Sequence, residues 1–406
     1  MKTTMVIPSY WGRESTVGWK NGDAVYDHAT PLDKEGTLLR ILQSLNILED
    51  KNFQLVILAV ATSEDIEEQV EKKVADIISS SDLGIDVLIF GNSHQRKIHD
   101  LFKKEGKENY INLLKLNGYS NIRNMCLFIP YILNSDIAVL IDDDEIFEDP
   151  KFMFKAKEFI GKTVNGKPVN AVAGYYLQPD GDYHVKKPIR PWMKYWNQYE
   201  SMNDAFDKII GTEPRLKETP FVFGGNMIIH RNLFTIIPFD PNVTRGEDID
   251  FLINAKMFGH KFFLDNQLSI KHLPPNKAHP IWMQLREDIY RFAYERAKLE
   301  NQKEIKGMTK VYAEEFDSYP GCFLKNDLNK KVDKSCRLLS EEYLAKDDKK
   351  GSEESLKNMV IVKTDAVPKF DPFQRLCELQ KKWEELMGWV NKTEIRSALK
   401  DLLKFY

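Results

Sequence analysis

The residues best suited to chemistry are the adjacent acids Asp142, Asp143, Asp144 and Glu145, which directly follow the apolar segment 136–141. A short aliphatic run of this kind is typical of a buried strand, and the acids begin where its carboxyl end leaves the sheet. Adjacent carboxylates repel one another, so a hard divalent cation with oxygen ligands would favour their ionised form. Because alternate strand residues face the same way, Asp142 and Asp144 can share one ligand while Asp143 points elsewhere. A solvated acidic turn is the alternative, and the buried strand before the block favours a site.

A second acidic group and a histidine lie farther along the chain. Glu247 and Asp248 begin a predicted helix that runs to about residue 258, where the helix dipole favours negative charge. Capping alone would explain one of these two acids. His272 ends a predicted strand just before two prolines. A single histidine is more often structural than a ligand, but an imidazole completes an acid-based metal site well.

Arg123 lies in a predicted helix over residues 119–133, between Asn121 and Asn124. An arginine with amide neighbours at the start of a helix can neutralise a phosphate or hold a base or ribose edge. Alone, such an arginine is more often a surface or structural residue. Its position directly before the acidic strand favours a binding role.

Aromatic residues and paired glycines mark the segment between the two acidic groups. Aromatic side chains are dense over residues 175–199, and they could stack on sugar rings or simply pack in the core. Gly224 and Gly225 separate two apolar runs. Paired glycines there allow the backbone to approach a ligand closely, although a β-bulge would use them too.

Length and composition limit what this site can belong to. The chain has 406 residues, which exceeds one ordinary core, so we expect a catalytic domain and a second unit. The 58 basic and 61 acidic residues give a net charge of -3, which argues against a dedicated nucleic-acid binder. The four cysteines have no zinc-binding spacing, and we identify neither a signal peptide nor an apolar run long enough to span a bilayer. We therefore expect a cytoplasmic protein without a transmembrane segment.

Strands and helices alternate through the first part of the chain. Apolar runs predict strands over residues 3–7, 53–61 and 85–90, and helical spacing predicts a helix over residues 34–48. This alternation favours an α/β fold with a mainly parallel sheet and helices on both faces. Residues 11–34 show no clear periodicity and are expected to form a long loop, which is either a lid or binding segment or a decoration.

The C-terminal part is expected to be mostly helical. Helical spacing predicts helices over residues 281–302 and 373–405. The charge-rich stretch 325–354 resembles a mobile loop or linker, although Leu338, Leu339 and Tyr343 could anchor a short helix in it. This extension could pack on the catalytic domain, close the site or make a contact between copies in a homo-oligomer.

Together and in this order, the motifs resemble those of the GT-A-fold, nucleotide-sugar-dependent glycosyltransferases of the family-two type. Asp142-Asp143-Asp144 resembles their DxD motif, and His272 falls where many metal-dependent members carry a histidine ligand, a layout shared with the mannosylglycerate-type synthases. The other matching segments are 6–10, 121–124, 224–234, 239–240 and 246–250. The resemblance implies a GT-A (Rossmann-like) catalytic domain over residues 1–275, with a mixed, mainly parallel sheet, and a helical C-terminal extension over residues 276–406.

The resemblance also implies a role for each matching residue. Asp144 and His272 would coordinate Mn²⁺ or Mg²⁺, which neutralises the diphosphate of the leaving group. Asp248 would be catalytic together with Glu247. The nucleotide-sugar donor would be held by Pro8, Ser9, Tyr10, Arg123, Asp142, Asp143 and Gly225.

The implied reaction moves a sugar from a GDP- or UDP-linked donor to a hydroxyl of a small soluble acceptor, with a glycerate-like compound as one candidate. Asp248 would act as general base in an inverting enzyme and would position the acceptor in a retaining one. Family members usually place an aspartate after the second strand to read the base, whereas this chain has Ala61-Thr62-Ser63-Glu64 there. That departure and the insertion at 11–34 leave the donor base open.

Two other functions fit parts of the pattern. A sugar nucleotidyltransferase also combines an α/β sheet with metal-binding acids, but we find no Gly-rich phosphate loop with a following Arg or Lys near the first strand. A non-catalytic nucleotide- or saccharide-binding relative would keep the fold without turnover. The presence of Asp142, Asp144, Asp248 and His272 favours an enzyme.

Overall fold

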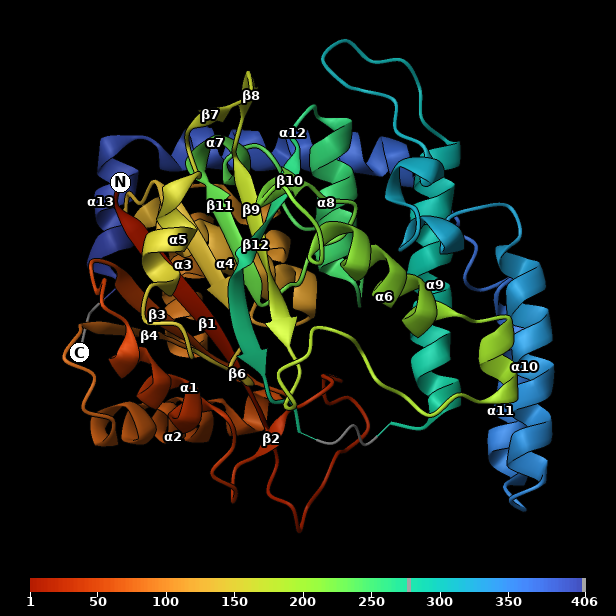
Figure 1. The fold of residues 1–406 in the computed structure, drawn as a ribbon. Coiled ribbons are helices and arrows are strands. Elements are labelled where there is room, and N and C mark those ends of the chain that lie inside the picture. Colours follow the sequence, from red (N-terminus) through yellow and green to blue (C-terminus); the bar gives the residue numbers. More distant parts are fainter. Residues whose placement is uncertain (276–278, 404–406) are drawn as a thin grey trace.

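A mixed, mainly parallel sheet forms the centre of the computed structural model, which describes residues 1–275 and 279–403 (Figure 1). Its strands are β1 (Thr3–Gly12), β2 (Thr30–Pro31), β3 (Gln54–Ala61), β4 (Val87–Phe90), β5 (Ile137–Ile141), β6 (Glu145–Ile146), β9 (Ala171–Leu177), β10 (Leu216–Glu218), β11 (Asn226–His230) and β12 (Phe262–His272). The strand order is β10-β12-β9-β11-β5-β1-β3-β4, with β2 beside β1 and β6 beside β12. β7 (Thr163–Val164) and β8 (Lys167–Pro168) form a separate hairpin.

Helices cover both faces of this sheet (Figure 1). The α-helices are α1 (Leu38–Ser44), α2 (Glu67–Ser80), α3 (Asn92–Lys104), α4 (Tyr119–Ile132), α5 (Phe152–Glu158), α6 (Gln198–Ile209), α7 (Arg231–Phe234), α8 (Glu247–Met257), α9 (Ile281–Glu300), α10 (Leu328–Leu344), α11 (Lys349–Ile361), α12 (Pro372–Val390) and α13 (Thr393–Asp401). Helices α1, α2 and α5 pack on one face, and α3, α4 and α8 on the other. Along β5, Ile137 and Val139 pack in the core beneath α1, α2 and α5, whereas Ala138 and Leu140 pack in the core beneath α3, α4 and α8. Burial on both faces explains why this strand is apolar throughout.

The predicted fold class is confirmed, because a mixed, mainly parallel sheet is flanked by helices and followed by a mostly helical C-terminal extension. The first strand is longer than predicted: β1 continues to Gly12 instead of ending at Pro8. Its ladder with β5 stops at Val6. Pro8 has no backbone N–H, and on the β5 side of β1 no strand is paired at this position that would need one.

Helix α12 of the C-terminal extension shares a core with the sheet. Trp383 is fully buried, and its indole nitrogen donates a hydrogen bond to the carbonyl of Phe234 at 2.9 Å. Tyr131 of α4 donates to the carbonyl of Met387 at 2.9 Å. The extension is therefore packed against the sheet-covering helices.

The charge-rich stretch 325–354 is mostly helical, so the expectation of a mobile loop or linker is wrong, and the helix that contains Leu338, Leu339 and Tyr343 is long and not short. It forms α10 and the first part of α11, and these two helices pack against each other beside α9 (Figure 1). Leu328, Val332, Cys336 and Leu339 make a narrow buried stripe, which the many charges around it hid in the sequence. The helical region expected over residues 373–405 divides into α12 and α13, and Phe405 lies outside the described residues. Among the helices of the described ranges, none has the length and apolarity needed to cross a membrane.

Candidate functional site

A cavity of about 330 Å³ lies at the carboxyl end of the central strands. Its lining includes Tyr10 from β1, Arg123 from α4, Asp142, Asp143 and Asp144 after β5, Tyr176 from β9, Glu247 and Asp248 from α8, and His272 from β12. The fold therefore gathers the acid block, the second acidic group and the histidine in one place, although they lie far apart in the sequence.

Arg123 connects the two acidic groups. Its guanidinium donates to the two carboxylate oxygens of Asp142 at 2.8 and 3.0 Å, and its Nε donates to Glu247 at 3.1 Å. The side chains of Arg123 and Glu247 are 4% and 9% exposed, so their ion pair is shielded from water, whereas Asp142 is 25% exposed. A Cβ at Gly224 would lie 2.8 Å from Arg123 Nη2, so a glycine there leaves room for the guanidinium. Burial raises the pKa of Glu247, and Arg123 opposes that rise.

Asp143 has a different partner from its neighbours. Its Oδ2 accepts a hydrogen bond from the Ser9 hydroxyl at 2.7 Å, and the Trp11 indole donates to the same hydroxyl oxygen at 2.9 Å. Burial, together with the charges of Asp144 and Asp142, raises the pKa of Asp143 to about 8. The acid block therefore holds a proton at neutral pH unless a cation compensates its charge.

Asp144 and His272 are brought together by the antiparallel pairing of β6 with β12. His272 Nε2 lies 3.3 Å from Asp144 Oδ2, and the ring of Tyr176 stacks on the imidazole with a centroid distance of 4.6 Å. The amide of Leu273 donates to the carbonyl of Asp144 at 2.8 Å. Burial would raise the pKa of Asp144, but the hydrogen bond from His272 and its charge lower it below its ordinary value.

The donor chemistry of this pair fits a divalent metal ion that is only partly coordinated by protein. One carboxylate and one imidazole are suitable ligands for a cation such as Mn²⁺. Within residues 1–275 and 279–403, no three or more His, Cys, Asp or Glu side chains are grouped so that they could hold a metal ion. Asp144 and His272 therefore suit a cation that takes its other ligands from phosphate oxygens and water.

Gly225 allows the acid block to pack against β11. A Cβ at this position would lie 2.1 Å from Glu145 Oε1 and 2.8 Å from Asp142 Cγ, and the amide of Gly225 donates to the Tyr176 hydroxyl at 2.8 Å. Burial raises the pKa of Glu145 well above its ordinary value. The close neighbours of Gly225 are thus protein groups, and Gly225 is outside the set that lines the cavity.

Pro8, Ser9 and Tyr10, which are expected to hold the nucleotide-sugar donor, lie within β1. Pro8 and Ser9 are buried inside β1 and do not line the cavity, whereas Tyr10 does. The ring of Tyr10 lies 4.6 Å from that of Tyr26 and 5.6 Å from that of Tyr119. Of the three residues, Tyr10 alone is placed to contact a ligand in this cavity.

Asp248 lies in the first turn of α8, two residues after Gly246. Its Oδ1 accepts a hydrogen bond from the amide of Ile249 at 2.8 Å. Burial raises the pKa of Asp248, which makes the carboxylate a better proton acceptor. Its position in the cavity leaves it able to meet a bound hydroxyl group.

The side chains that line the cavity and were given no role from the sequence include Arg245, Arg291 and Tyr319. Arg245 joins Asp27 of the long N-terminal loop at 3.2 Å to Glu287 of α9 at 2.7 Å. Arg245 had a signal, because it directly precedes the Gly-Glu-Asp sequence. The other two lie in the C-terminal extension, where nothing in the periodicity distinguishes a cavity residue from a surface residue.

The loop 11–34 builds a second cavity of about 760 Å³ beside the first. This cavity lies between the end of β1 and the segment after β12, and both cavities are lined by Asp27 and His28. Arg13 anchors the loop through Asp23 at 2.9 Å and Asp65 at 2.6 Å. The loop therefore forms a shared wall of the two cavities.

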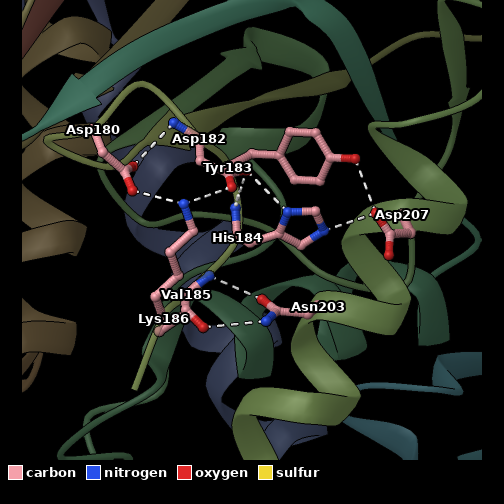
Figure 2. Close-up of polar contacts among 8 residues, drawn as sticks. All are labelled: Asp180, Asp182, Tyr183, His184, Val185, Lys186, Asn203 and Asp207. Atoms are coloured by element: carbon pink, nitrogen blue, oxygen red, sulfur yellow. Dashed lines mark hydrogen bonds and ion pairs between the residues drawn. The ribbon is translucent and has the colours of Figure 1, made fainter. Parts of the chain in front are cut away.

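A polar cluster holds the segment after β9 against α6, a helix that also lines the first cavity (Figure 2). His184 lies between two carboxylates, with Nδ1 2.9 Å from Asp182 Oδ1 and Nε2 2.8 Å from Asp207 Oδ1. The side chain of Asn203 exchanges hydrogen bonds of 2.9 and 3.1 Å with the backbone of Val185. Burial would lower the pKa of His184, but Asp207 and Asp182 together raise it above its ordinary value.

Comparison with known proteins gives distant similarities. No family model matches the sequence, and no curated protein matches it. Among solved structures, the chain is similar to the mannosyltransferase PcManGT from Pyrobaculum calidifontis in complex with GDP-Man and Mn²⁺, with 12% identity and a TM-score of 0.46 over 97% of this chain and 87% of that one. A mycobacterial protein has 15% identity and a TM-score of 0.39 over 73% of this chain and 74% of its own. GalNAc-T7 with UDP, GalNAc and Mn²⁺ has 12% identity and a TM-score of 0.37 over 73% of this chain and 51% of its own.

Proposed function

We propose that this chain is a metal-dependent glycosyltransferase of the GT-A type, which transfers a sugar from a nucleoside diphosphate sugar to a hydroxyl of a small acceptor. The observation that carries the proposal is that Asp144, His272 and Asp248 meet in one cavity at the carboxyl ends of the central strands. Such a reaction needs a cation site for the diphosphate and a group that takes the proton of the acceptor. The Asp144–His272 pair supplies the first, and Asp248 supplies the second.

The donor is proposed to lie across both cavities. Asp144 and His272 would hold Mn²⁺ or Mg²⁺, and the bound cation would neutralise the diphosphate of the leaving group. Asp142 accepts two hydrogen bonds from Arg123, and it would orient the donor beside Asp144 and His272. The nucleoside would enter the 760 Å³ cavity, because this cavity is large enough for a nucleoside and adjoins the cavity that contains the carboxylates.

The acceptor is proposed to lie in the 330 Å³ cavity, which has room for a small molecule such as a glycerate-like compound. As the acceptor oxygen bonds to the anomeric carbon of the donor, the bond from that carbon to the diphosphate breaks. The proton of the acceptor hydroxyl passes to Asp248. In a retaining reaction, Asp248 and Glu247 would instead position the acceptor.

Calorimetric titration of GDP and of UDP, each with Mn²⁺ and again with EDTA, tests this function. We expect one of the two nucleotides to bind in the presence of Mn²⁺ and to bind much more weakly in EDTA, which would also identify the donor class. The absence of binding by either nucleotide in both conditions would contradict the proposal. Release of pyrophosphate from a nucleoside triphosphate and a sugar phosphate would assign the chain as a nucleotidyltransferase instead.

A further inference from the structure

Arg291 brings a positive charge from the C-terminal extension into the catalytic cavity. It lies on α9 and lines the same cavity as Asp248, which lies on α8. Its side chain is 9% exposed, so its charge acts in surroundings that water screens poorly. The two side chains therefore face a common space, although one belongs to the sheet-based part of the chain and the other to the extension.

The guanidinium of Arg291 has a hydrogen-bond partner, an ion-pair partner and a close backbone neighbour. Its Nη2 donates a hydrogen bond to the Tyr319 hydroxyl at 2.8 Å, and its Nε lies 3.1 Å from Asp288 Oδ1. A Cβ at Gly246 would lie 2.3 Å from Nη1. Gly246 also has a φ of 73°, so both the backbone conformation and the space require glycine there. Arg291 Nη1 therefore lies close to the residue that caps α8, two positions before Asp248.

Charged and titratable groups on several elements act on Asp248. They are Arg123 on α4, Arg291 and Glu295 on α9, Asp142 after β5, the neighbouring Glu247 on α8, and Tyr319 after α9. Arg123 is already paired with Asp142 and Glu247, so its charge is shared. Burial raises the pKa of Asp248, and Arg291 opposes that rise together with Arg123. Without Arg291, Arg123 would be the remaining cation among these groups, and Arg123 also pairs with Asp142 and Glu247.

We propose that Arg291 is a positioning residue for the Asp248 carboxylate, so that the C-terminal extension completes the catalytic site. The inference rests on the role of Asp248 in the proposed function. Arg291 acts through Asp248: it favours the ionised carboxylate, which can take the proton of the acceptor hydroxyl.

Selective ¹³C labelling of aspartate carboxyls lets the ionisation of Asp248 be followed by NMR as the pH is varied, with Asp248→Asn identifying the signal. We expect Arg291→Met to raise the titration midpoint by about one pH unit or more, because a nearby opposite charge lowers a carboxyl pKa by about 1–3 units. Arg291→Lys keeps the charge but changes its geometry, and it should raise the midpoint less. The matched control is Arg296→Met on the same helix, where the side chain is 14% exposed and contacts Glu300 and Asn329; its midpoint should equal that of the wild type.

Hydrolysis of GDP- and UDP-hexoses over the same pH range gives a second readout. In Arg291→Met, the acidic limb of the rate profile should move to higher pH by the same amount as the NMR midpoint. Equal midpoints in Arg291→Met and the Arg296→Met control would overturn the positioning role. If the methionine variant does not fold, Arg291→Lys decides in the same way, since a midpoint equal to that of the control would also overturn it. A wild-type chain that binds neither nucleotide would instead refute the proposed function, independently of the NMR result.

Discussion

At the scale of single residues, the removal of Arg123 should clearly destabilise the molecule. It pairs with the buried Glu247 and the partly exposed Asp142, so Arg123→Met would leave two carboxylates without their cation. Breaking a buried pair costs about 3–5 kcal/mol of stability. Thermal denaturation should show a clearly lower midpoint for this variant. The control is Arg96→Met, which breaks an ion pair with Glu67. Arg96 is 53% exposed, so this pair is worth at most about 1 kcal/mol. Equal midpoints for the two variants would contradict the role of Arg123.

Asp144 is the residue on which the metal site depends. Asp144→Ala should reduce the affinity for the bound nucleotide in Mn²⁺ to the value measured in EDTA, because the variant removes the carboxylate of the Asp144–His272 pair. The calorimetric titration described above measures this directly. Asp149→Ala is a suitable control, since Asp149 pairs with Lys155 away from the cavity. An unchanged Mn²⁺-dependent affinity in Asp144→Ala would exclude Asp144 as a metal ligand.

Asp248 should be needed for transfer but not for donor binding. Asp248→Asn keeps the shape of the side chain and removes its ability to take a proton, so we expect the transfer rate to fall by about 10²–10⁴-fold. Nucleotide titration of the same variant should give the wild-type affinity, which also shows that the variant is folded. A fully active variant would remove Asp248 both as a base and as a group that positions the acceptor.

At the scale of elements, the stability that comes from the contacts between α6 and the segment after β9 should depend on pH. The pKa of His184 is raised in the folded state, so its contribution to stability is complete below the ordinary value of 6.5 and is lost as the pH rises through the raised value. His184→Gln should therefore lower the melting temperature more at pH 6 than at pH 9. Asn203→Ala breaks contacts between the same two elements without a titrating group, and its effect should be the same at both pH values. A pH-independent effect of His184→Gln would show that the imidazole is not held in its charged form.

At the scale of the whole molecule, the sheet and the C-terminal extension should not be separable. The division into 1–275 and 276–406 remains a prediction, but Trp383 and Met387 of α12 are bonded to the helical layer of the sheet. A chain that ends at residue 275 would expose the apolar surface that α12 covers, so we expect it to aggregate or to melt without a cooperative transition. Circular dichroism and size-exclusion chromatography would test this, with a chain ending at residue 391, which lacks α13 alone, as the milder control. A monomeric fragment 1–275 with a cooperative transition would contradict the expectation.

Two further predictions concern the oligomeric state and the cellular location of the protein. The proposed contact between copies through the C-terminal helices would appear as a dimer in size-exclusion chromatography of the full chain. The cytoplasmic location is likewise a prediction from the sequence.

The local pattern of the sequence was sufficient to predict the frame of the candidate site. The apolar run before Asp142 formed β5, and the helix expected around Arg123 formed α4. His272 ends β12, as its segment predicted. These predictions succeeded because strand burial and helix periodicity are set by residues that are close in the chain.

The sequence by itself determined that acids and a histidine end buried strands, and therefore that they meet at one edge of a sheet. Only the tertiary structure decided their partners: that Arg123 is paired with Asp142 and Glu247, and that Arg291 reaches the cavity from α9. It also decided that the charge-rich stretch 325–354 is helical, because the stabilising surface is the neighbouring helix and not the stretch itself. The physical reason is common to these cases: ion pairs and helix packing join residues that are distant in the chain, and local periodicity carries no information about which distant surface will be adjacent.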